Sequence, residues 1–260
     1  GIIGGSGGDG GVAIAASPVM QTMPFTSESL SKKLTSAQSA AMRDDRQFAG
    51  SRLVRGESSG DIGLEVAAGF WLDELLSGVL QTTAFPANPS SSDSDAMVNG
   101  QTKTFFLFEK RLEAESGMQF TTFQDCQVSM MSFDVQANSL ANMSISLLGL
   151  DAVNGTSQGG GSYSSYDLDD QMDTNSASLE FKTSGDVDID VTAQSFSLAL
   201  DNQMRGQQAV GYFFNAGNAS GRFKTTMSAS VYFRNMDLYT NFVNNTGFKV
   251  FLTLSDTAGN

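Results

Sequence analysis

The chain has 260 residues, 40% of them hydrophobic, which is enough for one large β domain or two small ones with a real core. Asp and Glu (28) outnumber Lys and Arg (15), and the net charge of −13 argues against a nucleic-acid binder, because basic side chains supply most of the affinity for phosphates. Histidine, the usual general base near neutral pH, is absent. The single cysteine, Cys126, can form neither an intramolecular disulfide nor a Cys/His zinc site. We therefore expect no catalysis, no cofactor or metal, and a buried, inert Cys126.

The first 55 residues divide into a glycine-rich start and a polar segment. Residues 1–20 are rich in glycine and predict a flexible N-terminal arm, without the Gly-Lys-Ser/Thr ending of a phosphate-binding loop or the basic start of a signal peptide. The chain from Met20 to Arg55 is polar, and a short helical turn is expected after Ser27 and Ser29. Solvated local ion pairs explain the charged cluster that contains Arg43 and Arg46, and an inter-subunit contact is the sharper alternative. No apolar run approaches the ~20 residues that cross a bilayer, so no membrane insertion is expected.

An amphipathic helix is predicted over 70–80, after a short alternating strand. Asp73 and Glu74 lie in its first turn, where the helix dipole favours acidic groups. Its apolar stripe repeats at helical spacing and consists of Leu72, Leu75, Leu76 and Val79. We expect this stripe to pack on a sheet of the same subunit, although a helix that docks on a partner would show the same pattern.

The middle of the chain carries the strongest strand signals. Phe106 and Phe108 belong to a run with large apolar groups on both strand faces. Such a strand is central, or it lies between a sheet and a helix or neighbouring subunit, so the two rings are candidate inter-subunit contacts. Between 126 and 135 the alternation changes phase between Met130 and Met131, which predicts a β-bulge.

A second β block is predicted over 179–260, after a loop or linker over 154–178. Three carboxylates share one face of an expected strand there, with ~7 Å between successive ones: Asp186, Asp188 and Asp190. They form a plain solvated face, a calcium site closed by a neighbouring loop, or an acidic strip that lines a channel. The block is similar in composition to the first, 21–153, which leaves a tandem duplication open.

Several short motifs occur in a specific order between Thr22 and Ser255. They are Gly60-Asp-Ile, Leu72-Asp-Glu-Leu-Leu, Phe105-Phe-Leu-Phe-Glu-Lys-Arg, Ser132-Phe-Asp-Val-Gln-Ala-Asn, Leu147-Leu-Gly and Phe196-Ser-Leu-Ala-Leu-Asp-Asn. In this order they resemble the major tail tube protein of long-tailed, siphovirus-type bacteriophages. The resemblance implies a mainly β fold, a sandwich or barrel with one flanking helix, as one unit or as two tandem tube repeats. The chain departs from the family at Asp125, where glycine often precedes the cysteine, and at Asn260, after which the family usually continues through a further strand.

The resemblance also implies a structural role in the virion. Subunits would join side by side into rings, with three chains and pseudo-six-fold symmetry if the duplication is real and six chains if it is not. Rings would stack through a long loop and a terminal arm into a tube, which is assembled in the host cytoplasm and meets other tail proteins at its ends. Double-stranded DNA would pass an acidic lumen without specific binding. An extracellular β-sandwich module for recognition or virion decoration is the alternative.

Overall fold

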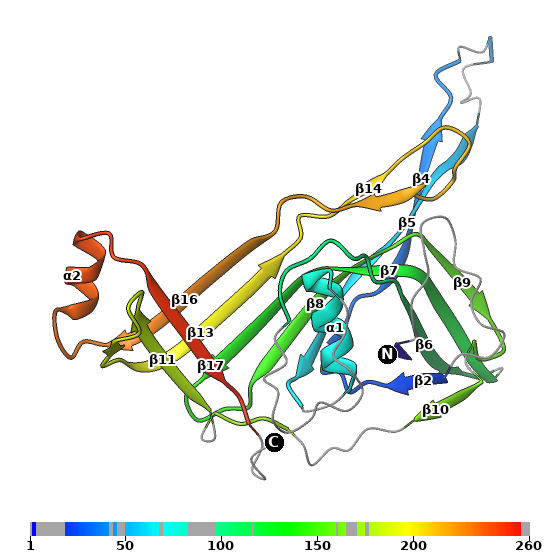
Figure 1. The fold of residues 1–260 in the computed structure, drawn as a ribbon. Helices are drawn as coiled ribbons and strands as arrows, with labels where there is room; N and C mark the ends of the chain where they lie inside the picture. Colours follow the sequence, from blue (N-terminus) through cyan, green and yellow to red (C-terminus); the bar gives the residue numbers. More distant parts are fainter. Residues whose placement is uncertain are drawn as a thin grey trace.

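Layers of mostly antiparallel strands make up the protein, which confirms the mainly β, sandwich-like prediction (Figure 1). The computed structural model describes residues 2–3, 19–41, 44–45, 50–67, 70–82, 97–115, 117–159, 161–164, 171–174 and 177–255. The strands are β1 (Ile2–Ile3), β2 (Val19–Thr22), β3 (Ser27–Glu28), β4 (Ser31–Gln38), β5 (Ser51–Glu65), β6 (Phe106–Ala114), β7 (Gly117–Gln136), β8 (Asn142–Gly149), β9 (Asp151–Gly155), β10 (Ser162–Ser164), β11 (Ser178–Thr183), β12 (Asp188–Ile189), β13 (Thr192–Asp201), β14 (Arg205–Gln207), β15 (Gly217–Ala219), β16 (Lys224–Tyr232) and β17 (Phe248–Thr253). The helices of the described residues are α1 (Phe70–Leu80) and α2 (Asp237–Val243).

One long sheet organises the molecule. Its strands run in the order β16-β13-β7-β8-β5-β3, and β4 also pairs with β5. Strand β7 is shared between two layers, because its C-terminal half pairs with β13 and β8 whereas its N-terminal half pairs with β6 and β9. Three smaller sheets, β1-β2-β10, β12-β11-β17 and β14-β15, complete the described fold.

Strand β7 bends where the sequence predicts a bulge. Its pairing register with β8 shifts between Val128 and Met130, which confirms the bulge within two residues of the predicted position. A bulge bends a strand and increases its twist, so β7 can pass from one layer to the other without ending. A second irregularity lies just before it, since the φ of Asp125 is +49°, in the left-handed region that favours glycine.

The core lies between the long sheet and a cover that includes α1. Leu75 and Val79 are fully buried, and Leu72 and Leu76 are half-buried against the same apolar cluster. Gly78 permits this close packing, because a Cβ at that position would lie 2.6 Å from the ring of Phe106. The four apolar residues of the predicted helix stripe therefore all face the sheet of their own subunit.

Phe106 and Phe108 are core residues. Their exposed fractions are 2% and 0%, and their ring centroids lie 6.2 Å apart within the main apolar cluster. A neighbouring subunit cannot touch side chains that are covered on every side by their own chain. The proposed inter-subunit role of these rings is therefore corrected: α1 packs against Phe106, and Met20 and Tyr163 pack against Leu107 of the same strand.

The second β block completes the sheet that the first block begins. Strand β13 pairs with β7 over Ser195–Asp201, and β16 pairs with β13. The chain between the blocks supplies β10, which pairs with β2. A second helix, α2, lies between β16 and β17. It was not predicted, and none of its residues is buried.

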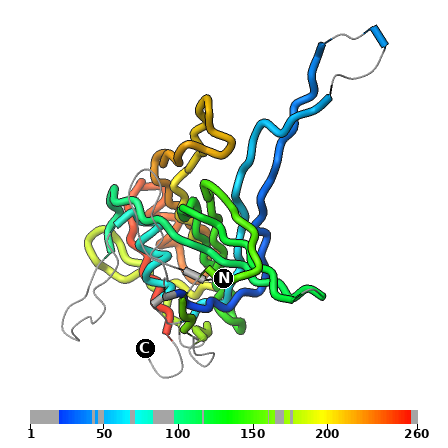
Figure 2. Tube along the Cα trace, turned by 90° about the vertical axis from the view of Figure 1, so that its right-hand side faces the viewer, coloured from blue at the N-terminus to red at the C-terminus, as the bar shows by residue number. Residues whose placement is uncertain are grey.

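A long hairpin replaces the helical turn predicted after Ser29. Strands β4 and β5 pair from Ser31↔Ser59 to Gln38↔Ser51 and project far from the body (Figures 1 and 2). Nearly all residues of β4 are exposed, so the strand lacks the alternation of apolar and polar residues that identifies half-buried strands. We call Ser31–Gln38 together with residues 51–56 the arm.

Leu75→Ala is expected to lower the free energy of unfolding by about 2–5 kcal/mol, because the truncation leaves a cavity in a fully buried site. Leu76→Ala, at a half-buried position on the same helix, should cost less. Chemical denaturation of both variants measures the difference, and an unchanged midpoint for Leu75→Ala would contradict the packing described above.

Candidate assembly surfaces

The three aspartates predicted to share a strand face lie at a short, exposed hairpin. Only Asp188 belongs to β12, and Asp186 has a φ of +60° in the preceding turn. Each carboxylate is paired with a cation, in the pairs Asp186–Lys249 (2.6 Å), Asp188–Lys182 (3.4 Å) and Asp190–Arg234 (2.9 Å). The Lys249 ammonium lowers the pKa of the Asp186 carboxyl. The pairs offset much of the negative field that an acidic strip would need.

The structure adds little about two other predicted sites, the Arg43–Arg46 cluster and Cys126. Arg43 and Arg46 lie outside the described residues. Cys126 is buried, and its burial raises the pKa of the thiol far above its usual range.

The described residues contain no cluster of three or more Asp, Glu, Cys or His side chains that could hold a metal ion. No described helix has the length and apolarity that crossing a membrane requires.

One face of the long sheet is polar and carries small side chains. Alternate residues of its strands point away from the core, and the register places them side by side across four strands. This polar face consists of Ser132, Asp134 and Gln136 on β7, Asn142, Ser144 and Ser146 on β8, Ser195 and Ser197 on β13, and Ser228 and Ser230 on β16. All ten are exposed or half-exposed, so this face packs against no other layer formed by the described residues. The sequence shows the alternation of serine with apolar residues, but it does not show which face of the sheet is exposed to solvent.

Both edges of the long sheet are open within the described chain. Strand β16 pairs only with β13, and β4 and β3 pair only with β5. The first seven residues of β16 are exposed on both faces. A strand edge presents unpaired N–H and C=O groups, which readily pair with another chain.

The arm is basic and partly apolar. Its residues, 31–38 and 51–56, contain four of the 15 Lys and Arg residues and none of the 28 Asp and Glu residues. Leu34, Leu53 and Val54 on it are about half exposed. An extended hairpin with exposed apolar and basic side chains is suited to contact with an acidic surface.

The β14–β15 hairpin braces the base of the arm. The Gly56 N–H donates to the Phe213 carbonyl at 2.8 Å, and the Lys32 ammonium lies 4.6 Å from the centroid of the Phe214 ring. The ring is so close that a Cβ on Gly56 would lie 2.3 Å from its Cε1 atom. Glycine is therefore required at position 56 by the space available, and this contact fixes where the arm leaves the body.

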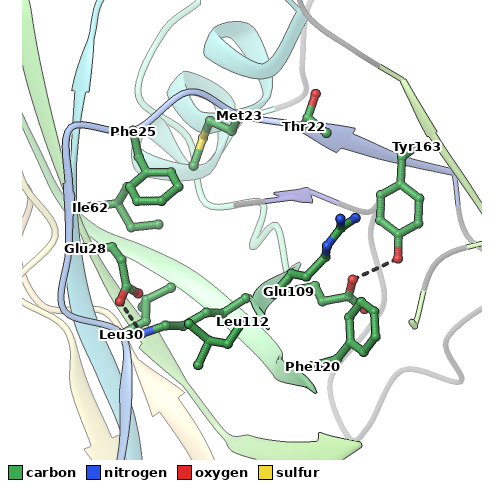
Figure 3. A pocket seen from close by; sticks show the side chains of 12 residues that line it. Thr22, Met23, Phe25, Glu28, Leu30, Ile62, Glu109, Leu112, Phe120 and Tyr163 are labelled. Atoms are coloured by element: carbon green, nitrogen blue, oxygen red, sulfur yellow. Dashed lines mark hydrogen bonds and ion pairs between the residues drawn. The ribbon is translucent and has the colours of Figure 1, made fainter. Parts of the chain in front are cut away.

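A groove of about 560 Å³ opens between the β2–β3 segment and β6. Figure 3 shows Met23 and Phe25 on one side of the hollow and Leu112 and Phe120 on the other. Glu28 pairs with Lys110, and the buried Glu109 carboxylate accepts from the Tyr163 hydroxyl at 2.8 Å. Because these charged groups are paired, the groove presents a mainly apolar lining.

Helix α2 lies at the end of the molecule opposite the groove (Figure 1), and exposed apolar side chains form a patch around it. No residue of α2 is buried. The patch consists of Tyr232, Phe233, Met236, Tyr239, Phe242 and Val243, all more than half exposed. Monomeric proteins rarely expose so many large apolar groups together, so the patch indicates a binding surface.

A protein with two open sheet edges, a projecting arm and uncovered apolar surface has the features of an assembly subunit. A family model described as phage tail tube protein matches residues 7–260, and the chain therefore belongs to the phage tail tube protein family. It is a structural component of the virion tail, and proteins of this family are generally not enzymes. A comparison with curated proteins found no match.

Gly56→Ala is expected to lower the free energy of unfolding by about 1–3 kcal/mol, because the added methyl group overlaps the Phe214 ring. In a Phe214→Ala background the ring is absent, so Gly56→Ala should change the free energy of unfolding very little. A double-mutant cycle by chemical denaturation measures this coupling. Gly247→Ala is the matched control, since a Cβ there has open space, and equal costs at positions 56 and 247 would contradict the brace.

Proposed function

We propose that this protein polymerises into stacked rings that form the phage tail tube, the conduit through which genomic DNA leaves the capsid for the host cell. Membership of the tail tube family supports the structural role. The observation that carries the proposal further is the polar face of the long sheet, which no other layer in the described part of the subunit covers. We infer that this face lines the lumen.

The chemistry of the polar face suits a passage for DNA. Its small hydroxyl groups offer little surface for bases to stack on, and Asp134, with Asp61 and Asp201 on neighbouring strands, adds negative charge. A wall without a surplus of fixed cations cannot hold a phosphate backbone, so the duplex can slide. The cation-paired Asp186, Asp188 and Asp190 are better suited to the outside of the tube.

The open edges support ring closure. If β16 of one copy pairs with the β3–β4 edge of the next, the same contact repeats around an axis, and a repeated heterologous contact closes into a ring when its rotation allows. Both β blocks contribute to one sheet in each subunit. This favours six chains in the ring over three chains with two repeats each.

Charge supports stacking through the arm. The arm is basic in a chain whose net charge is −13, so the rest of the surface is more acidic still. We propose that the arm of one ring reaches the acidic body of the next, in the host cytoplasm where the tail is built, and that other tail proteins meet the tube at its ends.

Negative-stain electron microscopy and native mass of the purified protein test the proposal directly. Rings or tubes with a six-chain repeat are expected, and a three-chain repeat would restore the tandem interpretation. Monomers alone across a wide concentration range would contradict the tube and favour the recognition or decoration module.

Lysine substitutions test which surface faces the lumen. In the variant with Asp134→Lys, Gln136→Lys and Asn142→Lys, all three positions are exposed on the polar face, so tubes should still assemble. The new ammonium groups would lie within the Debye length of ~8–10 Å from a passing phosphate backbone, so salt would screen their attraction only in part. The tube should therefore retain DNA, and retention should weaken as the salt concentration rises. Ejection rates from reconstituted particles measure the effect.

The matched control carries Asp186→Lys, Asp188→Lys and Asp190→Lys. If those side chains lie outside the tube, this variant should eject DNA at the wild-type rate. Retention by the control and not by the polar-face variant would reverse the assignment of the lumen.

A further inference from the structure

We propose that α2 of one subunit docks in the groove between the β2–β3 segment and β6 of the next copy. The inference rests on the proposed ring and adds a specific side-chain contact that holds neighbouring copies together. It follows from three independent features: an uncovered patch, a hollow that fits it, and the positions of both.

The patch around α2 has the size of an interface. Phe233 and Phe242 are 77% and 81% exposed, and the other four side chains of the patch are about 60% exposed. Since an aromatic side chain presents 150–250 Å², the patch exposes on the order of 700 Å². Specific interfaces bury about 800 Å² on each partner, so the patch is adequate for a stable contact.

The groove has the complementary shape. Its volume of about 560 Å³ accommodates two or three aromatic side chains. Phe25 and Leu112, on its two sides, are 55% and 51% exposed, so its walls are uncovered as well (Figure 3). Aromatic side chains that enter a preformed apolar pocket are the usual centres of binding energy in interfaces.

The two surfaces lie where ring closure needs them. The patch follows directly after β16, the strand at one edge of the long sheet. The groove includes Glu28 of β3, the strand at the other edge. They lie at opposite ends of the molecule, so one copy cannot dock its own α2 (Figure 1). Pairing of the two sheet edges between copies would bring the patch of one copy to the groove of the next.

Charge favours this occupant. Asp237 lies in the first turn of α2 and is exposed. Arg111 is exposed at the groove and lies beside the apolar wall residue Leu112. A carboxylate and a guanidinium at the rim of an apolar contact fix its orientation and exclude a partner of like charge. A second copy of this chain supplies both the apolar groups and the matching charge.

Disulfide trapping between two singly substituted chains tests the contact. Phe242→Cys and Leu112→Cys place thiols on the patch and the groove, and the native thiol of Cys126 is buried. After mild copper-catalysed oxidation of assembled rings, the mixture of the two variants should give linked dimers. Neither variant alone should, because the contact joins unlike surfaces.

Assembly measurements supply a second test. In the Phe233→Ser/Phe242→Ser variant the critical concentration for ring formation should rise roughly tenfold or more, as loss of central aromatic contacts does. Val98→Ser, at a residue that is 68% exposed away from the patch and groove, is the control and should assemble as wild type does. Asp237→Arg should weaken assembly, and mixing it with Arg111→Asp should restore alternating rings.

The outcomes separate this inference from the tube itself. Absence of rings in wild type would contradict the proposed function. Wild-type rings that form equally well from the serine variant, with no trapped dimer in the mixture, would overturn the docking of α2. Disulfide-linked dimers of Phe242→Cys alone would indicate a symmetric contact between two α2 helices and would overturn the inference. Ready maleimide labelling of that cysteine in intact tubes would also overturn it, because α2 would then be free to bind another tail protein.

Discussion

Strand β7 is the constraint on which the rest of the structure depends. Its C-terminal half holds β8 on one side and β13 on the other, and its N-terminal half holds β6 and β9. Backbone hydrogen bonds from this single strand thus join both β blocks and both layers. The bulge between Val128 and Met130 makes this possible, because a straight strand of 20 residues could not follow both layers.

The sequence allowed prediction of the parts of the fold whose side chains are buried. The helix stripe around Leu75 and the alternation of β8 are packing patterns, and packing leaves a periodic signal. The arm and α2 lack that signal, since their apolar groups are exposed. The inter-subunit prediction for Phe106 and Phe108 was wrong for a different reason. The sequence pattern of a strand that is covered on both faces is the same whether its own chain or a neighbouring subunit covers it.

The candidate surfaces were harder to predict because they depend on which strand faces remain open. Alternation alone placed Asp186, Asp188 and Asp190 together, but the pairing of each with a cation from β11, β17 or the segment after β16 is a tertiary property. Gly56 shows no pattern at all, and its role comes from a ring that lies 158 residues later in the chain. The family resemblance supplied the function that composition alone could not.

The backbone of Asp125 has a consequence for how the sequence can vary. Its φ of +49° is tolerated by aspartate better than by most residues but suits glycine best. An L-residue in this region carries strain of about 1–2 kcal/mol, next to the bend on which both layers depend. A glycine at this position would relieve that strain, and the stability gained would offset a destabilising change elsewhere in the subunit, for example on the arm or the polar face. The backbone angle of one residue beside the bend of β7 therefore contributes to how large a loss of stability the distant arm and polar face can tolerate.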